Sequence, residues 1–169
     1  MSEASSKSTG APKSKGEWWF YHLERTSLEE ALGPLLEKCL QKDWRVLIVG
    51  DGDRLPKLDL GLWTWKADSF LPHARLGGRD EIDPMAQPIL LSNTPEPANK
   101  ADIIVLLDGK RLPNEPDDAT QYIRCMVVFD GDDFNARDTA RSQFKGAKDA
   151  GQTVSYFQQN DRGGWDKKA

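Results

Sequence analysis

Short apolar runs rich in β-branched residues alternate along this chain with segments of helical periodicity. Such runs, bounded by Gly, Pro, Asn or Asp, are typical of strands that are buried within a sheet. Their alternation with helices predicts a single α/β domain with a mainly parallel sheet flanked by helices. The expected strands are 17–23, 44–49, 88–92, 103–107, 123–129 and 153–157, and the expected helices are 26–41, 54–63 and 134–150.

The segment 26–41 gives the clearest helical pattern. Apolar residues recur every three or four positions, as one face of a helix requires: Leu28, Ala31, Leu32, Leu35, Leu36, Cys39 and Leu40. Thr26 or Ser27 can begin a capping box with the glutamate three residues later. Pro34 lies inside the pattern and removes a backbone donor, but the apolar stripe continues through it, so we retain the helix.

The length of 169 residues suits one domain with a normal core. Residues 1–16 contain no large apolar residue after Met1, so they cannot offset their ordering entropy by burial. We therefore expect a disordered leader at 1–16 and one folded domain at 17–169. Cys39 and Cys125 each lie within an apolar run, which is typical of buried, reduced thiols.

The net charge of −4 makes the whole chain a poor ligand for a phosphate backbone, because DNA binding needs clustered Lys and Arg. Any link to DNA is therefore expected to run through another protein. No apolar run approaches the length of a membrane span, and the polar N-terminus lacks a signal-peptide core. We expect no membrane contact and a cytoplasmic location. Loops rich in Gly, Pro, Asn and Asp are expected at 73–87 and 93–100.

Signals for enzyme chemistry are weak. Gly50 and Gly52 follow a strand as in a dinucleotide-binding loop, but Leu55 occupies the third glycine position. Asp130 and its acidic neighbours lie at a strand end where catalytic carboxylates can occur, but a turn and a helix N-terminus also favour acids, and we prefer that interpretation. No spacing predicts a metal site or a catalytic nucleophile. We expect a binding module without catalytic residues, metal or cofactor; the alternative is a nucleotide-binding Rossmann-like enzyme.

One candidate interaction surface is the aromatic segment 62–73. Trp63, Trp65 and Phe70 fall close together outside any clear strand. Large aromatic side chains on loops and helix ends are common anchors of protein interfaces, whereas the alternative is that they pack against the edge of the core. Because charged residues stand between them, we do not expect all three to be buried.

A second candidate surface lies on the helix 134–150. Positive charges repeat along one face, at Arg137, Arg141, Lys145 and Lys148, with Phe144 at the edge of that stripe. A separate face of alanines can pack closely on the sheet. A basic stripe beside an aromatic ring suits a short acidic peptide that ends in aromatic residues. An ordinary solvated face is the alternative, and direct binding of single-stranded DNA by Arg and Trp residues is another.

Several of these segments resemble the DNA polymerase III chi subunit family. The resemblance begins with the aromatic strand Trp19-Phe20-Tyr21-His22-Leu23 and extends over residues 17–169. Its most specific part is Leu62-Trp63 followed by Asp68-Ser69-Phe70-Leu71-Pro72-His73. Pro88-Ile89-Leu90-Leu91 and the ending from Tyr156 to Trp165 are similar to further family segments.

The resemblance implies a Rossmann-like fold and a non-catalytic accessory subunit of the clamp-loader complex in DNA replication. It implies two partners, namely the psi subunit or another clamp-loader component, and the acidic C-terminal tail of single-stranded-DNA-binding protein. Trp63 and Phe70 match the psi-contacting aromatics. The positions that match or adjoin the tail site are Arg137, Arg141, Phe144, Lys145, Lys148 and Tyr156. Phe144 stands where a family tyrosine can occur.

Overall fold

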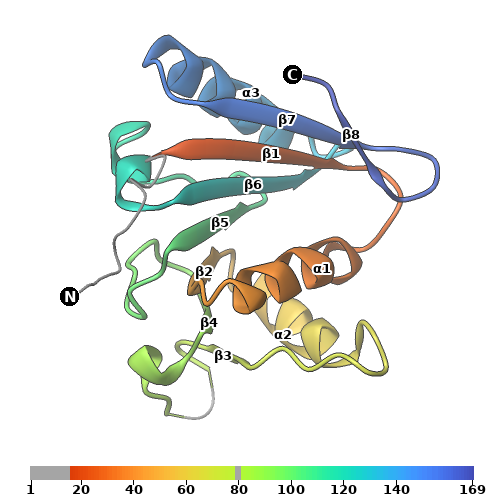
Figure 1. Cartoon of the computed structure of the whole chain (residues 1–169), viewed down its shortest axis with the longest axis vertical. Coiled ribbons are helices and arrows are strands. Elements are labelled where there is room, and N and C mark those ends of the chain that lie inside the picture. The colour runs from red at the N-terminus through yellow and green to blue at the C-terminus, as the bar shows by residue number, and fades with distance from the viewer. Residues whose placement is uncertain (1–15, 79–80) are drawn as a thin grey trace.

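The computed structural model describes residues 16–78 and 81–169. Within these residues eight strands form one sheet in the order β3-β4-β2-β5-β6-β1-β7-β8 (Figure 1). Every neighbouring pair is parallel except β7 and β8. The strands are β1 (Glu17–Leu23), β2 (Val46–Val49), β3 (His73–Arg75), β4 (Ile89–Ser92), β5 (Ile103–Leu107), β6 (Arg124–Asp130), β7 (Val154–Gln159) and β8 (Trp165–Lys167). The predicted α/β fold with a mainly parallel sheet is confirmed.

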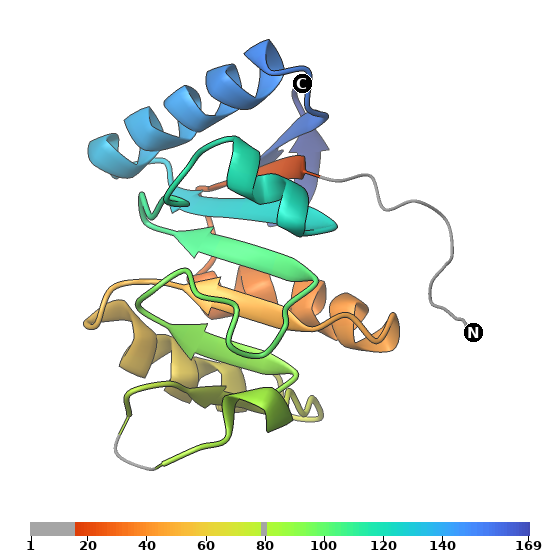
Figure 2. The same ribbon diagram turned by 90° about the vertical axis from the view of Figure 1, so that its left-hand side faces the viewer.

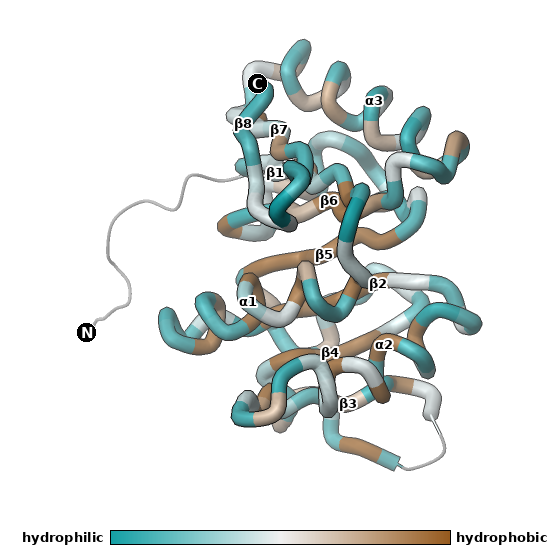
Figure 3. The backbone as a smooth tube through the Cα atoms, turned by 90° about the vertical axis from the view of Figure 1, so that its right-hand side faces the viewer, coloured by the Kyte–Doolittle hydropathy of each residue, from teal (hydrophilic) through white to brown (hydrophobic). Residues whose placement is uncertain are grey.

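The central strands are apolar because both of their faces are covered. Every residue of β2, β4 and β5 is buried, and Figure 3 shows these strands as the most hydrophobic part of the backbone. Their side chains divide between two apolar clusters, one on each face of the sheet. Continuous β-branched runs therefore mark strands whose alternate side chains enter different cores.

Helices α1 (Leu28–Gln41) and α2 (Arg54–Thr64) pack together on one face of the sheet. Ser27 caps α1, and Glu30 completes the capping box, so the second of the two expected caps is the one formed. The helix begins at Leu28, later than expected, and continues through Pro34 as predicted.

Helix α3 (Phe134–Asp149) covers the opposite face over β6, β1 and β7 (Figure 2). Ala136, Ala140 and Ala147 are buried beneath it, as predicted, since small side chains allow a helix to approach a sheet closely. Asp133 caps the helix by accepting a hydrogen bond from the amide of Ala136. The opposite face of α3 therefore remains available to solvent.

Two parts of the predicted outline were wrong. The expected loop 73–87 contains the edge strand β3 and a short 3₁₀ helix, η1 (Pro84–Ala86). Strand β8 was not expected, because it has only three residues and its pairing depends on a turn after β7. A second short 3₁₀ helix, η2 (Asp117–Gln121), precedes β6. All four of these elements are too short to show a hydrophobic period in the sequence.

The expected leader lies outside the described residues except for Gly16, whose amide donates to the carbonyl of Tyr122. Cys39 and Cys125 are both buried and free, as predicted. In the described part of the chain, none of the helices combines the length and the apolarity that crossing a bilayer demands.

Candidate protein-binding site on helix α3

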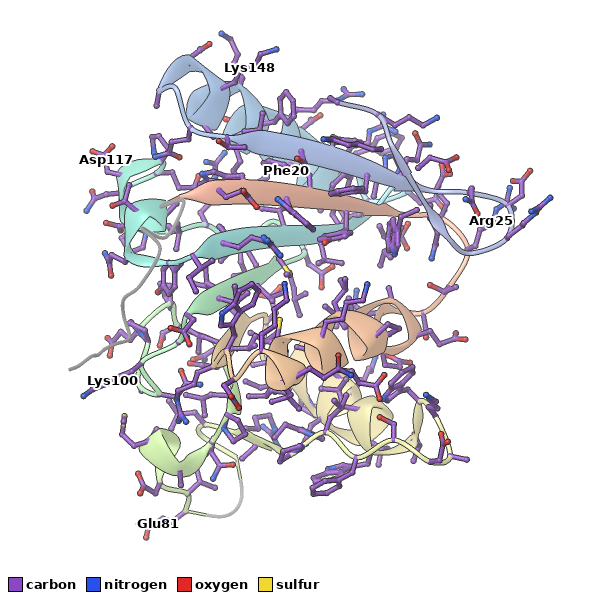
Figure 4. The ribbon with its side chains drawn as sticks, viewed as in Figure 1. Phe20, Arg25, Glu81, Lys100, Asp117 and Lys148 are labelled. Carbon is purple, nitrogen blue, oxygen red and sulfur yellow. The ribbon has the colours of Figure 1, made fainter. Side chains whose placement is uncertain are left out.

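The basic stripe of α3 is largely exposed and largely unpaired. Arg141 and Lys148 are exposed and form no ion pair with any residue of 16–78 or 81–169. Figure 4 shows Lys148 projecting outward from the far end of the helix, whereas Phe20 lies on the sheet. Cations without an internal partner can be neutralised by an incoming anionic ligand, so the stripe retains its capacity to attract one.

Lys145 differs because it already has a partner. Its Nζ lies 2.9 Å from a carboxylate oxygen of Asp149, one helical turn later. The hydrogen bond and charge of Asp149 raise the pKa of Lys145. Both side chains are well exposed, and a surface ion pair of this kind adds little stability. A bound carboxylate could therefore replace Asp149 at low cost.

Phe144 connects the charged surface to the core. The ring is half-buried and meets Phe20 edge-on, with 5.5 Å between the ring centroids. It meets Tyr156 in the same manner at 6.1 Å. Lys148 Nζ lies 6.0 Å from the centre of the Phe144 ring. The half-exposed ring is thus fixed by aromatic contacts below and bordered by positive charge above, as an anchor for an apolar peptide side chain requires.

Tyr156 forms the wall next to Phe144. Its ring stacks on Phe20 at 6.3 Å, and its hydroxyl lies 2.9 Å from Nδ1 of His22. Burial raises the pKa of Tyr156, while the positive charge of Arg141 acts in the opposite direction. Strands β1 and β7 pair directly, with Phe20 opposite Tyr156, so this wall is set by sheet register.

His22 is a site residue that sequence reasoning did not assign. It packs against Gly131, where any added Cβ would overlap the imidazole ring. Nε2 of His22 lies 3.8 Å from a carboxylate oxygen of Glu24. Burial lowers the pKa of His22, Glu24 opposes this effect, and Arg137 reinforces it. The sequence could have indicated this position, because His22 and Phe20 are two residues apart in one strand and so face the same side of the sheet.

Phe134 was also missed. It begins α3 one turn before Arg137, and 71% of its surface is exposed. The Arg137 guanidinium lies 5.3 Å from the centre of its ring, and Nη1 of Arg137 donates to the carbonyl of Gly131 at 3.4 Å. The basic stripe therefore has an aromatic ring at its start as well as at its edge. Extending the helical period back by one turn would have included it.

The aromatic segment 62–73 is divided by the fold. Trp63 and Phe70 are 46% and 71% exposed, and their ring centroids lie 5.8 Å apart. Trp65 instead packs against the core beside Gly33 of α1. Only part of the segment is therefore buried, as expected. The Trp63–Phe70 pair and the exposed Leu60 form an apolar surface that we call the α2 patch.

The structure brings together Arg137, Arg141, Phe144, Lys145, Lys148 and Tyr156 along α3 and the adjacent β7. It separates them from the α2 patch, because α2 and α3 lie on opposite faces of the sheet (Figure 1). A ligand on one surface therefore leaves the other free.

A third feature is an acidic cavity of about 560 Å³ at the carboxyl ends of the central strands. This edge is where open α/β sheets bind nucleotides. Its lining contains more acids than bases: Asp51, Asp53, Asp108, Asp130, Asp132 and Asp133, with Arg54 and Lys57. Arg54 is already engaged by Asp108, with N–O distances of 2.7 and 3.0 Å. Such an environment repels phosphates.

Turn and capping contacts occupy part of this acidic cluster, as the sequence favours. Asp130 accepts a hydrogen bond from the amide of Asp132, and Asp133 caps α3. Among the residues that the structure describes, no group of three or more His, Cys, Asp or Glu side chains is arranged to hold a metal ion.

The family model described as DNA polymerase III chi subunit, HolC, matches residues 16–155. The chain belongs to this family. A curated relative, the probable DNA polymerase III subunit chi of Rickettsia prowazekii (strain Madrid E), is 23% identical over 154 residues. The similarity covers 88% of this chain and 90% of the relative. Membership of the chi family implies an accessory role in DNA replication within a DNA polymerase III complex. The match includes α2 and α3, and Tyr156 follows its last residue.

Proposed function

We propose that this chi-family protein is a non-catalytic adaptor whose α3 site binds the acidic C-terminal tail of single-stranded-DNA-binding protein. The observation that carries the proposal is the unpaired Arg141 beside the half-buried ring of Phe144. Arg141 and Lys148 attract the carboxylates of the tail, and the Phe144–Tyr156 wall receives an apolar side chain. Arg141 stands three residues before Phe144 and Lys148 four residues after it, so the peptide lies along the part of α3 between these two cations.

A second partner completes the adaptor. The α2 patch binds the psi subunit or another clamp-loader component through Trp63 and Phe70. Exposed, mutually packed aromatic rings are preferred anchors at protein interfaces. Single-stranded-DNA-binding protein would then be linked to the replisome through one rigid domain, and DNA would be reached indirectly. We place this activity in the cytoplasm and expect no contact with a membrane.

The adaptor is favoured over the nucleotide-binding enzyme by the charge of the cavity at the strand ends. Asp51 and Asp53 follow β2 where a phosphate-binding loop needs free amides and no negative charge. It is favoured over direct binding of single-stranded DNA by the net charge of −4.

The test is a titration of a labelled synthetic peptide that reproduces the acidic tail. Arg141→Glu is expected to weaken binding by about 1 to 3 kcal/mol, or roughly 5- to 150-fold, because a charge-assisted contact becomes a repulsion. Lys145→Glu is expected to cost less, since Asp149 already neutralises part of that charge.

Lys38→Glu is the matched control, because Lys38 is an exposed cation in α1, on the other face of the sheet. It makes the same change in net charge. Equal losses for Arg141→Glu and Lys38→Glu would reduce the effect to long-range charge and refute the site. Binding that does not weaken with added salt would also contradict a charge-steered contact.

A further inference from the structure

A cavity of about 310 Å³ opens beside the α2 patch, between α2 and the edge strand β3. Asp59 and Trp63 line it from the helix, and His73 and Arg75 line it from the strand. His73 and Arg75 are two residues apart, so their side chains leave the same face of β3. One ring, Trp63, belongs both to the cavity and to the exposed aromatic pair.

Two of the polar groups in the cavity are satisfied internally. Nε2 of His73 lies 2.9 Å from a carboxylate oxygen of Asp59 and 2.9 Å from its carbonyl oxygen. Nδ1 of His73 lies 2.6 Å from the carbonyl oxygen of Leu71. The imidazole also lies against Trp63, with ring centroids 4.2 Å apart. Both ring nitrogens of His73 therefore have partners, and its contact with Asp59 joins β3 to α2 at the wall of the cavity.

Arg75 differs from this pair, because one of its guanidinium nitrogens is unsatisfied. Its Nε is buried and has no hydrogen-bond partner among the residues that the structure describes. Among residues 16–78 and 81–169 the guanidinium makes no ion pair. A buried donor without an acceptor is unfavourable, and native structures contain few of them. A guanidinium is also the side chain best suited to bind a carboxylate through two parallel hydrogen bonds. Arg75 lines the cavity, so its guanidinium is the group there best suited to meet an anion.

We propose that this cavity binds a carboxylate side chain of the protein partner, placed there by a segment whose apolar residues cover Trp63 and Phe70. This rests on the proposed role of the α2 patch as a partner surface. Arg75 supplies the charge complementarity that the apolar patch lacks. The partner is therefore an amphipathic segment with a glutamate or aspartate next to its apolar anchor, and Arg75 determines its specificity.

The test uses a pair of small peptides, N-acetyl-Phe-Glu-amide and N-acetyl-Phe-Gln-amide, with phenylacetate as a free carboxylate. Binding is followed by NMR on the side-chain Nε–H signal of Arg75, assigned by its loss in Arg75→Gln, and on the indole signal of Trp63. The glutamate peptide is expected to shift both signals with a dissociation constant on the order of millimolar. The glutamine peptide is expected to bind at least about tenfold more weakly, and Arg75→Gln to abolish the difference between them.

Three results would overturn the proposal: equal binding of both peptides, an unchanged preference for the glutamate peptide in Arg75→Gln, or tighter binding of free phenylacetate than of the glutamate peptide. The last result would assign the cavity to a small metabolite. Phe70→Ala separates this proposal from the proposed partner surface, because Phe70 lies outside the cavity. That variant is expected to retain the glutamate preference even if the α2 patch proves to bind no clamp-loader component.

Discussion

The hydroxyl of Tyr156 and Nδ1 of His22 lie 2.9 Å apart, which joins β7 to β1 directly beneath the basic stripe of α3. The two rings also meet nearly at right angles, with centroids 6.1 Å apart. This contact fixes the ring of Tyr156, which meets the ring of Phe144 edge-on. We therefore expect this hydrogen bond both to stabilise the fold and to position Tyr156 in the proposed peptide site.

Tyr156→Phe is expected to lower the free energy of unfolding by about 0.5 to 1.5 kcal/mol. The substitution removes the hydroxyl and leaves Nδ1 of His22 without that partner, whereas the stacking on Phe20 is retained. Urea denaturation measured by tryptophan fluorescence provides the value. Affinity for the acidic tail is expected to fall less than in Phe144→Ala, which removes the anchoring ring itself. A stability equal to that of the parent would show that this hydrogen bond contributes nothing.

The second prediction concerns pH. Burial lowers the pKa of His22 below its ordinary 6.5, Glu24 and Asp130 oppose this effect, and Arg137 and Arg141 add to it. Between the lowered pKa and 6.5 the unfolded chain binds more protons than the folded chain. Stability due to His22 is therefore fully present above pH 6.5 and is lost as the pH falls toward the folded-state pKa.

His22→Gln removes this proton uptake. The difference in unfolding free energy between about pH 7.5 and pH 5.5 is expected to be smaller in His22→Gln than in the parent protein. His73, the other histidine of the chain, is unchanged in both proteins and cancels in the comparison. A loss of stability of the same size in both proteins would rule out His22 as a source of acid sensitivity.

Two helical glycines provide the third prediction. A Cβ added at Gly33 of α1 would overlap the ring of Trp65, whereas a Cβ at Gly146 of α3 would meet no atom within 4 Å. Gly33→Ala is expected to destabilise the protein by about 1 to 3 kcal/mol, because the ring must move. Gly146→Ala is expected to stabilise it by about 0.5 to 1 kcal/mol through helix propensity alone.

Denaturation of both variants under the same conditions measures this difference in sign. The pair is informative because each variant makes the same substitution inside a helix. If Gly33→Ala were as stable as Gly146→Ala, Trp65 would not be held against α1 and would join Trp63 as an exposed ring.

Local pattern was sufficient for six of the eight described strands and for the long helices. The run Ile103–Leu107 is apolar throughout because both of its faces are covered, and such a run has few alternatives to a central strand. The alanines of α3 likewise indicated which face meets the sheet. Strand β8 and the edge strand β3 were not predicted, because short elements depend on hydrogen bonds to strands distant in the sequence.

The proposed peptide site shows the same division. The spacing of Arg137, Arg141 and Lys145 was visible as a helical stripe. The freedom of Arg141, the engagement of Lys145 by Asp149, and the position of His22 were not, since each depends on which side chains the fold places nearby. The sequence likewise did not show which rings of the aromatic segment 62–73 are buried. In the fold, Trp65 packs beside Gly33, whereas Trp63 is exposed.

The amino-acid sequence by itself determined the α/β class, the order of the long elements and the charge of α3, because these follow from periodicity along one chain. Only the tertiary structure decided which aromatic rings reach solvent, which cations lack partners and that the two candidate surfaces lie on opposite faces of the sheet. The physical reason is that burial and ion pairing are properties of neighbours in space, and those neighbours come from strands far apart in the sequence.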